Sequence, residues 1–207
     1  MMAREPKSLR DRQRVQTQTE ILEAVIDVIA ADSADGPVVE QIAAQAGVSR
    51  ATLYAHFPGG MEEMATKAYE LAGLKFIQRV QAIQADSTSW RERIAAHARA
   101  MVDIAEDRSL GRFYNISAAR YASIGTPTGA GSRASYDDFV RELTTGRDQG
   151  ELAEIDIEET ARLLVGAVRV VGVRAAEFPE LGLASLRAFE RILDGLRQSQ
   201  EAGAGPA

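Results

Sequence analysis

The sequence predicts an all-α protein in which a small three-helix head precedes a larger bundle of about six further helices. Apolar residues recur at three- and four-residue steps through most of the 207 residues, which is the spacing of helices with one buried face. We find none of the strict alternation of apolar and polar residues that marks a half-buried strand. Since 45% of the residues are hydrophobic, the chain can bury a sizeable core.

The first helix is expected over residues 12–31, and the polar stretch at 32–37 ends it. Its apolar stripe comprises Val15, Ile21, Leu22, Val25, Ile26, Val28 and Ile29. A short helix at 38–46 follows and stops at Gly47. Ser49 stands where an N-cap is needed, so a third helix is predicted from residue 50 to about 57.

Beyond the sequence Pro58-Gly59-Gly60, the chain is a series of amphipathic segments with polar or glycine-rich breaks. Helices are predicted at 61–84, 89–107, 109–122, 133–149, 157–177 and 183–199. The glycine-rich stretch 125–132 fits no phosphate-loop pattern and is interpreted as a connection. We expect an N-terminal domain at 1–60, a C-terminal domain at 61–201 and a disordered tail at 202–207.

Composition excludes several classes of protein. There is no cysteine, so disulfides and thiolate chemistry are absent. The basic N-terminus and the charges within the first apolar stretch suit neither a secretion signal nor a membrane span, and we expect a soluble cytoplasmic protein. The net charge of -6 is unusual for a nucleic-acid-binding protein, but residues 1–19 are basic and residues 41–60 contain no acid.

The segment from residue 39 to 57 meets the physical requirements of a helix-turn-helix. Two short helices must cross closely, so Ala43 has to be small, and Gly47 can adopt the positive φ of a sharp turn. Five apolar residues should hold this crossing against the first helix. They are Ile42, Ala46, Val48, Leu53 and Phe57.

That packing leaves five side chains for double-stranded DNA: Ser49, Arg50, Thr52, Tyr54 and His56. A guanidinium suits guanine or phosphate, and hydroxyls and an imidazole suit phosphates and base edges. The alternative for Tyr54 and His56 is packing against the first or the fourth helix.

The motif resembles the signature of TetR-family regulators in Ile42-Ala43, Ala46 to Ser49, Thr52 to Tyr54, and His56 to Pro58. The resemblance implies a DNA-binding head, a helical body with a small-molecule pocket, and a homodimer formed by the last two helices. It also implies induction, in which an effector changes the separation of the two heads.

Two departures from that family pattern concern phosphate contacts. Pro37 and Val38 stand where relatives have hydroxyl residues, and Met61 stands where relatives have Lys. The hypothesis is that Arg10, Arg12 and Arg14 compensate, and the alternative is a solvated, frayed terminus. Glu40, where relatives often have Arg, is interpreted as simply exposed.

An apolar effector cavity is the hypothesis for the aromatic residues of the body, because sensing pockets are largely aromatic with a few polar anchors. The candidates are Trp90, His97, Met101, Ile104, Phe113, Tyr114, Tyr121, Tyr136 and Phe139. The alternative is plain core packing. No cofactor or metal ion is expected, and His97 has no catalytic partners in the sequence.

A dimer seam is expected from the last two helices, where small residues would let helices approach closely. The candidates are Leu164, Val165, Val168, Val171, Leu186, Phe189 and Leu193, with Leu196, Gly166 and Gly172 nearby. The alternative is a monomeric core. The predicted function is therefore a ligand-responsive DNA-binding regulator, most simply a repressor, and not an enzyme. The competing hypothesis is a helical enzyme or protein-binding module that keeps the helix-turn-helix as a scaffold.

Overall fold

The computed structural model of the chain describes residues 8–31, 38–118 and 129–197, which are all-α as predicted. None of these residues forms a strand, and one isolated bridge joins Leu152 to Arg197. The helices are α1 (Leu9–Ala31), α2 (Val38–Gln45), α3 (Arg50–His56), α4 (Gly60–Gln84), α5 (Trp90–Glu106), α6 (Arg108–Arg112), the π-helix η1 (Phe113–Ser117), α7 (Ala130–Asp148), α8 (Ile157–Glu177) and α9 (Pro179–Gly195).

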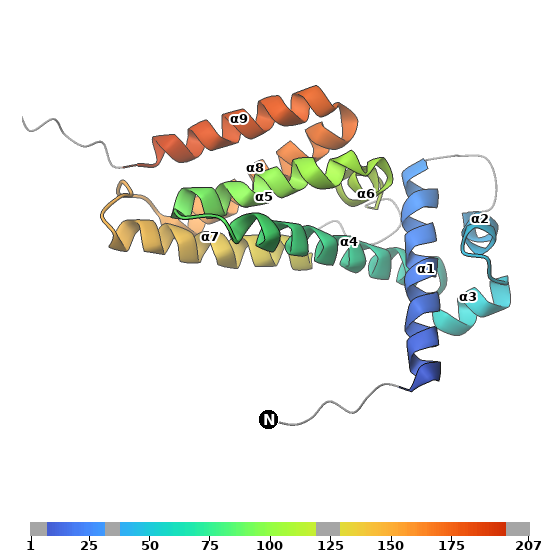
Figure 1. Cartoon of the computed structure of the whole chain (residues 1–207). Coiled ribbons are helices and arrows are strands. Elements are labelled where there is room, and N and C mark those ends of the chain that lie inside the picture. The colour runs from blue at the N-terminus through green and yellow to red at the C-terminus, as the bar shows by residue number, and fades with distance from the viewer. Residues whose placement is uncertain (1–7, 32–37, 119–128, 198–207) are drawn as a thin grey trace, which may run out of the picture.

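The helices α1, α2 and α3 form a head at one end of the molecule (Figure 1). The second half of α1 carries the buried stripe, including Ile21, Val25 and Ile29, and Ile42 and Leu53 from the other two helices are also fully buried. Val15, which was predicted to belong to the stripe, is instead exposed. The first half of α1 therefore projects beyond the packed part of the head.

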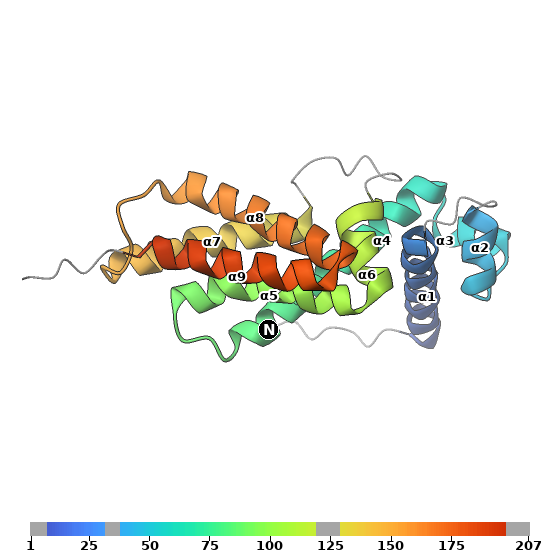
Figure 2. The same ribbon diagram turned by 90° about the horizontal axis from the view of Figure 1, so that it is seen from above.

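The bundle consists of α4, α5, α7, α8 and α9, with α5 in the centre between α9 on one side and α4 and α7 on the other (Figures 1 and 2). Aromatic residues fill the interior, and Phe76, Phe113, Phe139 and Phe189 are all buried. α8 and α9 pack so closely that a Cβ on Gly182 would lie 2.5 Å from that of Ala175. Small residues thus set the spacing of the last two helices.

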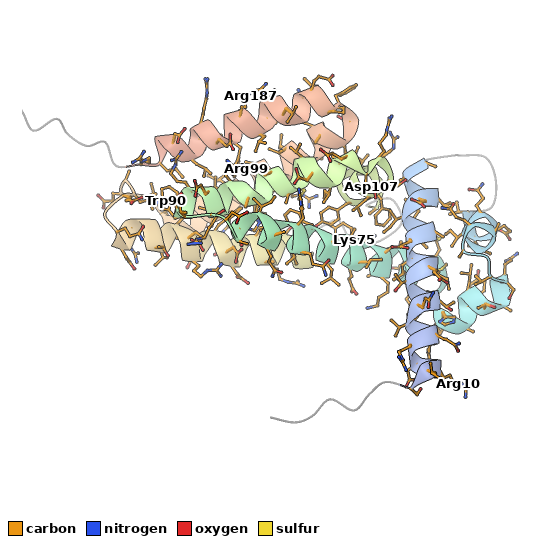
Figure 3. All side chains as sticks on the ribbon, viewed as in Figure 1. Arg10, Lys75, Trp90, Arg99, Asp107 and Arg187 are labelled. Carbon is orange, nitrogen blue, oxygen red and sulfur yellow. The ribbon has the colours of Figure 1, made fainter. Side chains whose placement is uncertain are left out.

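The head and the bundle are joined by α4, which packs against both α1 and α5, and by α6 and η1, which pack against α1 and α8. Lys75 of α4 pairs with Glu23 of α1 at 3.2 Å, near the crossing visible in Figure 3. A π-helix inserts an extra residue into a turn and is common at functional sites. Here it follows directly on α6 at the junction.

Most predicted helices are found within a few residues of their expected bounds. The predicted helix at 109–122 is instead divided into α6 and η1, and residues 119–128 lie outside the described part. The last helix begins four residues earlier than predicted, at Pro179, because a proline at the first helical position has no N–H to leave unpaired. The predicted tail at 202–207 also lies outside the described residues.

Candidate functional site

The turn between α2 and α3 is a Schellman motif centred on Gly47. The amide of Val48 donates to the carbonyl of Ala43 at 3.0 Å, and the amide of Gly47 donates to that of Ala44 at 3.2 Å. Gly47 has a φ of +65°, so the predicted positive φ is confirmed. The two bonds satisfy the last carbonyls of α2 and fix the direction in which α3 begins.

Ser49 is the N-cap of α3, as predicted. Its hydroxyl accepts from the amide of Thr52 at 3.1 Å and also lies 2.9 Å from the Thr52 hydroxyl. The cap satisfies one free amide of the first turn. The two hydroxyls are therefore paired with each other at the start of the helix.

The outer face of α3 is open in the single chain. Arg50, Ala51, Tyr54 and Ala55 are exposed, while Leu53 and Phe57 on the opposite side are buried. Residues four apart lie above one another on a helix, so these four form one surface. Ala51 and Ala55 were not among the predicted residues, although their spacing from Arg50 and Tyr54 could have identified them. Alanine methyls can contact the methyl group of thymine.

Thr52 and His56 lie at the edge of this face and are half-buried. The Nδ1 atom of His56 is buried and has no hydrogen-bond partner in the described part of the chain. The ring of Tyr54, which is 41% exposed, lies beside Gly60 at the start of α4, where a Cβ would lie 3.6 Å from its Cε1. Tyr54 thus combines packing against the fourth helix with an exposed edge.

Acidic side chains lie on the helices that precede and follow α3. Arg50 of α3 is ion-paired with Glu40 of α2. The sequence predicts only that Glu40 is exposed, whereas the structure also gives it this partner. The first turn of α4 holds Glu62 and Glu63, and Glu63 accepts from the amide of Gly59 at 2.7 Å. Val38 is the first residue of α2, and its side chain has no hydroxyl group. Pro37 lies outside the described residues.

The basic residues Arg10, Arg12 and Arg14 are exposed, and all three lie within α1. Ser8 and Asp11 stabilise the beginning of this helix, because the Asp11 amide donates to the Ser8 hydroxyl at 3.1 Å and the Ser8 amide donates back to Asp11 at 3.2 Å. Arg10 lies at the free end of α1, away from the bundle (Figure 3). These cations are therefore carried on a helix.

A small cavity lies inside the bundle between α4, α5, η1, α7 and α8. Its volume is about 10 Å³, which is room for about one water molecule. Its lining comprises Tyr69, Phe76, Met101, Tyr114, Asn115, Gly131, Ser132, Ser135, Val165, Val168 and Arg169. Burial raises the pKa of the Tyr114 phenol, which the nearby Tyr69 raises further and Arg169 lowers. Both apolar and polar side chains therefore line the cavity.

A buried polar network lies beside this cavity. His97 is within hydrogen-bond distance of Ser135 through Nδ1, at 2.9 Å, and of Asp138 through Nε2, at 3.2 Å. The Ser135 hydroxyl also donates to the carbonyl of Gly131 at 3.0 Å. Burial alone would raise the pKa of Asp138, but hydrogen bonds from His97 and Arg141 outweigh it and lower this pKa to about 2.

Residues 21–68 match the family model described as "Bacterial regulatory proteins, tetR family". This range contains the C-terminal half of α1, all of α2, the turn and α3, and the beginning of α4. The helix-turn-helix segment of this chain is therefore similar to that of the TetR family of bacterial regulators. No curated protein sequence matches the chain.

Solved structures share the fold of this chain over most of its length. A TetR-family transcriptional regulator from Pectobacterium atrosepticum is 23% identical, with 92% of this chain and 98% of the other covered and a TM-score of 0.68. One from Rhodococcus sp. is 19% identical, with 87% and 98% covered and a TM-score of 0.75. The regulator FadR from Bacillus subtilis, solved in complex with stearoyl-CoA, is 19% identical, with 84% and 96% covered and a TM-score of 0.66.

The predicted pocket residues are divided between the cavity and the core. Met101 and Tyr114 line the cavity, whereas Trp90, His97, Phe113 and Phe139 are buried outside its lining. Trp90 lies at the end of the bundle farthest from α1 (Figure 3), where its Nε1 donates to Glu151 at 3.1 Å. Ile104 is buried, Tyr136 packs under Arg162, and Tyr121 lies outside the described residues.

The residues predicted for the dimer seam face the interior of the single chain. Leu164, Val165, Val168, Val171, Phe189 and Leu193 are buried there, and Leu186 is half-buried. Gly172 packs against Asn115 and Met101. The opposite sides of α8 and α9 are exposed and carry apolar or small residues, which we call the outer face: Leu163, Gly166, Val170, Ala184, Ala188 and Ile192.

In the described part of the chain, no group of three or more His, Asp and Glu side chains is placed to hold a metal ion. Likewise, no helix there is both long and apolar enough to cross a membrane.

Proposed function

We propose that this chain is a ligand-responsive, DNA-binding transcriptional regulator that acts as a homodimer on a palindromic operator. The observation that carries the proposal is the open outer face of α3, which begins at a fixed Schellman turn and a serine cap. A helix presented in this way can enter a major groove, with its N-terminal residues against base edges. Arg50, Tyr54, Ala51 and Ala55 are the residues we assign to that contact, with Ser49, Thr52 and His56 at its edge.

The dimer that we propose uses α8 and α9, as the sequence suggested, but through the outer face. The reason is that a side chain buried within its own chain cannot also contact a second copy. Leu163, Gly166 and Val170 follow one side of α8, and nothing lies within 4 Å of a Cβ placed on Gly166. Exposed apolar residues beside an open glycine allow two helices to approach closely.

The effector that we propose is amphipathic, and it occupies an enlarged form of the cavity. A lining that combines aromatic, aliphatic and hydroxyl groups with the guanidinium of Arg169 suits an apolar molecule with a polar or anionic end. At about 10 Å³ the cavity cannot hold such a molecule as it stands, so binding has to move the surrounding helices. FadR, with its stearoyl-CoA, is a relative in which an amphipathic anion is bound.

The route from effector to DNA that we propose passes through η1. Tyr114 and Asn115 of η1 line the cavity, and η1 and α6 pack against α1 of the head. An effector that displaces η1 therefore changes the position of α1, and with it the separation of the two α3 helices. A ligand that favours the wider spacing weakens operator binding, which is the behaviour of a repressor released by its inducer.

The experiment that tests the proposal is selection of duplexes from a random DNA pool by the full-length protein. We expect a palindrome with two half-sites about one helical turn, or ~34 Å, apart. A folded dimer that enriches no sequence would contradict the proposal and favour a helical module that keeps the motif as a scaffold. Amphipathic compounds that raise the melting temperature should then weaken binding to the enriched duplex.

A further inference from the structure

An ion pair crosses the helix-turn-helix at the first residue of α3. The Nη1 atom of Arg50 contacts Oε1 of Glu40, whose side chain lies on α2. Both side chains are accessible, with 58% of the Arg50 side chain and 38% of the Glu40 side chain exposed. An acidic residue is thus attached to the leading cation of the helix that we propose enters DNA.

The other side chains at the start of α3 do not compete for Arg50. Ser49 and Thr52 are paired with each other through their hydroxyls, and residues 51 and 55 are alanines. Within the described part of α3 the other basic residue is His56, at the far end and half-buried. Glu40 is therefore the acidic partner of the Arg50 guanidinium at the start of α3.

The chemistry of the guanidinium decides what this pairing does. Arginine has five N–H donors in a planar fork, so a carboxylate on one nitrogen leaves donors for a second partner. A free arginine on a DNA-facing helix is drawn to the nearest phosphate, a contact that carries no sequence information. A carboxylate beside it repels phosphates, whereas the O6 and N7 atoms of guanine are neutral acceptors that suit the remaining donors.

We infer that Glu40 is a specificity-determining residue, which holds Arg50 away from the phosphates so that Arg50 reads a guanine in each half-site. The inference rests on the proposed DNA-binding function. It also gives a role to an acidic residue of α2, the helix that precedes the proposed DNA-reading helix. Exposed ion pairs are weak, shifting equilibria by about fivefold at most, so the pair can adjust when DNA arrives.

The test compares wild type with E40Q, R50Q and the double variant E40Q/R50Q, as full-length proteins. Binding to the enriched duplex and to a scrambled duplex of equal length is measured by fluorescence anisotropy over a range of salt concentrations. For E40Q we expect tighter binding to the scrambled duplex and a salt slope steeper by about one per protomer, because Arg50 gains a phosphate. The affinity ratio of enriched to scrambled duplex should fall by up to about fivefold per protomer.

The R50Q variant should lose the guanine preference at one position of each half-site, and E40Q should add nothing in the R50Q background. E62Q is the matched control, since it removes the same charge from the first turn of α4 without touching Arg50. It should leave the affinity ratio unchanged. The inference is overturned if E40Q leaves the ratio and the salt slope as in wild type, or if E40Q lowers the ratio equally without Arg50. A wild-type protein that does not discriminate between the duplexes would instead contradict the proposed function itself.

Discussion

The imidazole of His97 lies 3.2 Å from the carboxylate of Asp138, linking the central helix α5 to α7 inside the bundle. Gln84 of α4 also donates to this carboxylate at 3.3 Å, and Arg141 contacts its other oxygen at 2.5 Å. Three helices are therefore joined at one acidic group. The neighbouring Ser135 lines the cavity, so the network also supports one wall of the proposed effector site.

The first prediction concerns this carboxylate. Asp138→Asn should reduce the free energy of unfolding at pH 7 by about 1–3 kcal/mol, because hydrogen bonds to a charged group are lost. The pKa of Asp138 is lowered from 3.8 to about 2 in the folded chain, so its stabilisation is present above pH 4 and decreases as the pH falls towards 2. Urea unfolding should therefore show the difference between wild type and variant shrinking between pH 5 and pH 3.

Asp103→Asn is the matched control for this prediction. Asp103 pairs with Arg79 on the surface, and we expect less than about 1 kcal/mol from its loss. A difference between wild type and Asp138→Asn that stays constant from pH 7 to pH 3 would show that the carboxylate charge is not the cause.

The second prediction concerns the turn. Gly47→Ala should destabilise the fold by about 1–2 kcal/mol, because a residue with a Cβ pays this cost in the left-handed conformation. Nothing lies within 4 Å of the added Cβ, so no clash contributes. Gly47→Asn should cost less, since asparagine tolerates this conformation. Thermal or urea unfolding of both variants measures the order, and equal losses would point to a cause other than backbone conformation.

The third prediction concerns the spacing of α8 and α9. Gly182→Ala places a Cβ 2.5 Å from that of Ala175, so α9 has to shift, and we expect a loss of about 1–3 kcal/mol. Gly195→Ala, at the other end of the same helix, meets nothing within 4 Å and should be neutral or slightly stabilising. If urea denaturation gives the same midpoint for both variants, α9 does not pack on α8 as described.

The fourth prediction concerns the outer face. Leu163→Glu puts a charge where the second copy is proposed to dock, and it should weaken dimerisation by about 30-fold or more. Leu74→Glu is the control, because Leu74 is also exposed but lies on α4. Sedimentation equilibrium should show a monomer for the first variant and a dimer for the second. If both variants are dimers, the interface does not include Leu163 and must lie elsewhere.

The local features of the head could be predicted because each depends on neighbouring residues. The Ser49 hydroxyl caps the helix that follows it, and Gly47 adopts the positive φ of the turn. Both features depend only on residues that are close in sequence. The Glu40 contact with Arg50 could not be seen in this way, because it depends on how two helices cross. An acid on α2 and a base at the start of α3 were the available signal.

The body was less predictable, because periodicity shows that a helix has an apolar side without showing what that side faces. α8 has apolar residues on both sides, Leu164 and Val168 within the chain and Leu163 and Val170 on the surface, and the pattern does not distinguish them. Aromatic residues likewise indicate burial, so Trp90 and Phe139 could not be separated from Tyr114, which reaches the cavity. The cavity is lined by five elements distant in sequence.

The most direct test of the account changes the spacing of the two half-sites in the enriched duplex. Two α3 helices on one dimer must meet successive major grooves on the same side of the DNA. An insertion of about 5 base pairs turns one half-site to the opposite side, and we predict that binding falls to the level of a single half-site. Binding of the intact dimer that is unchanged by this insertion would contradict the central claim.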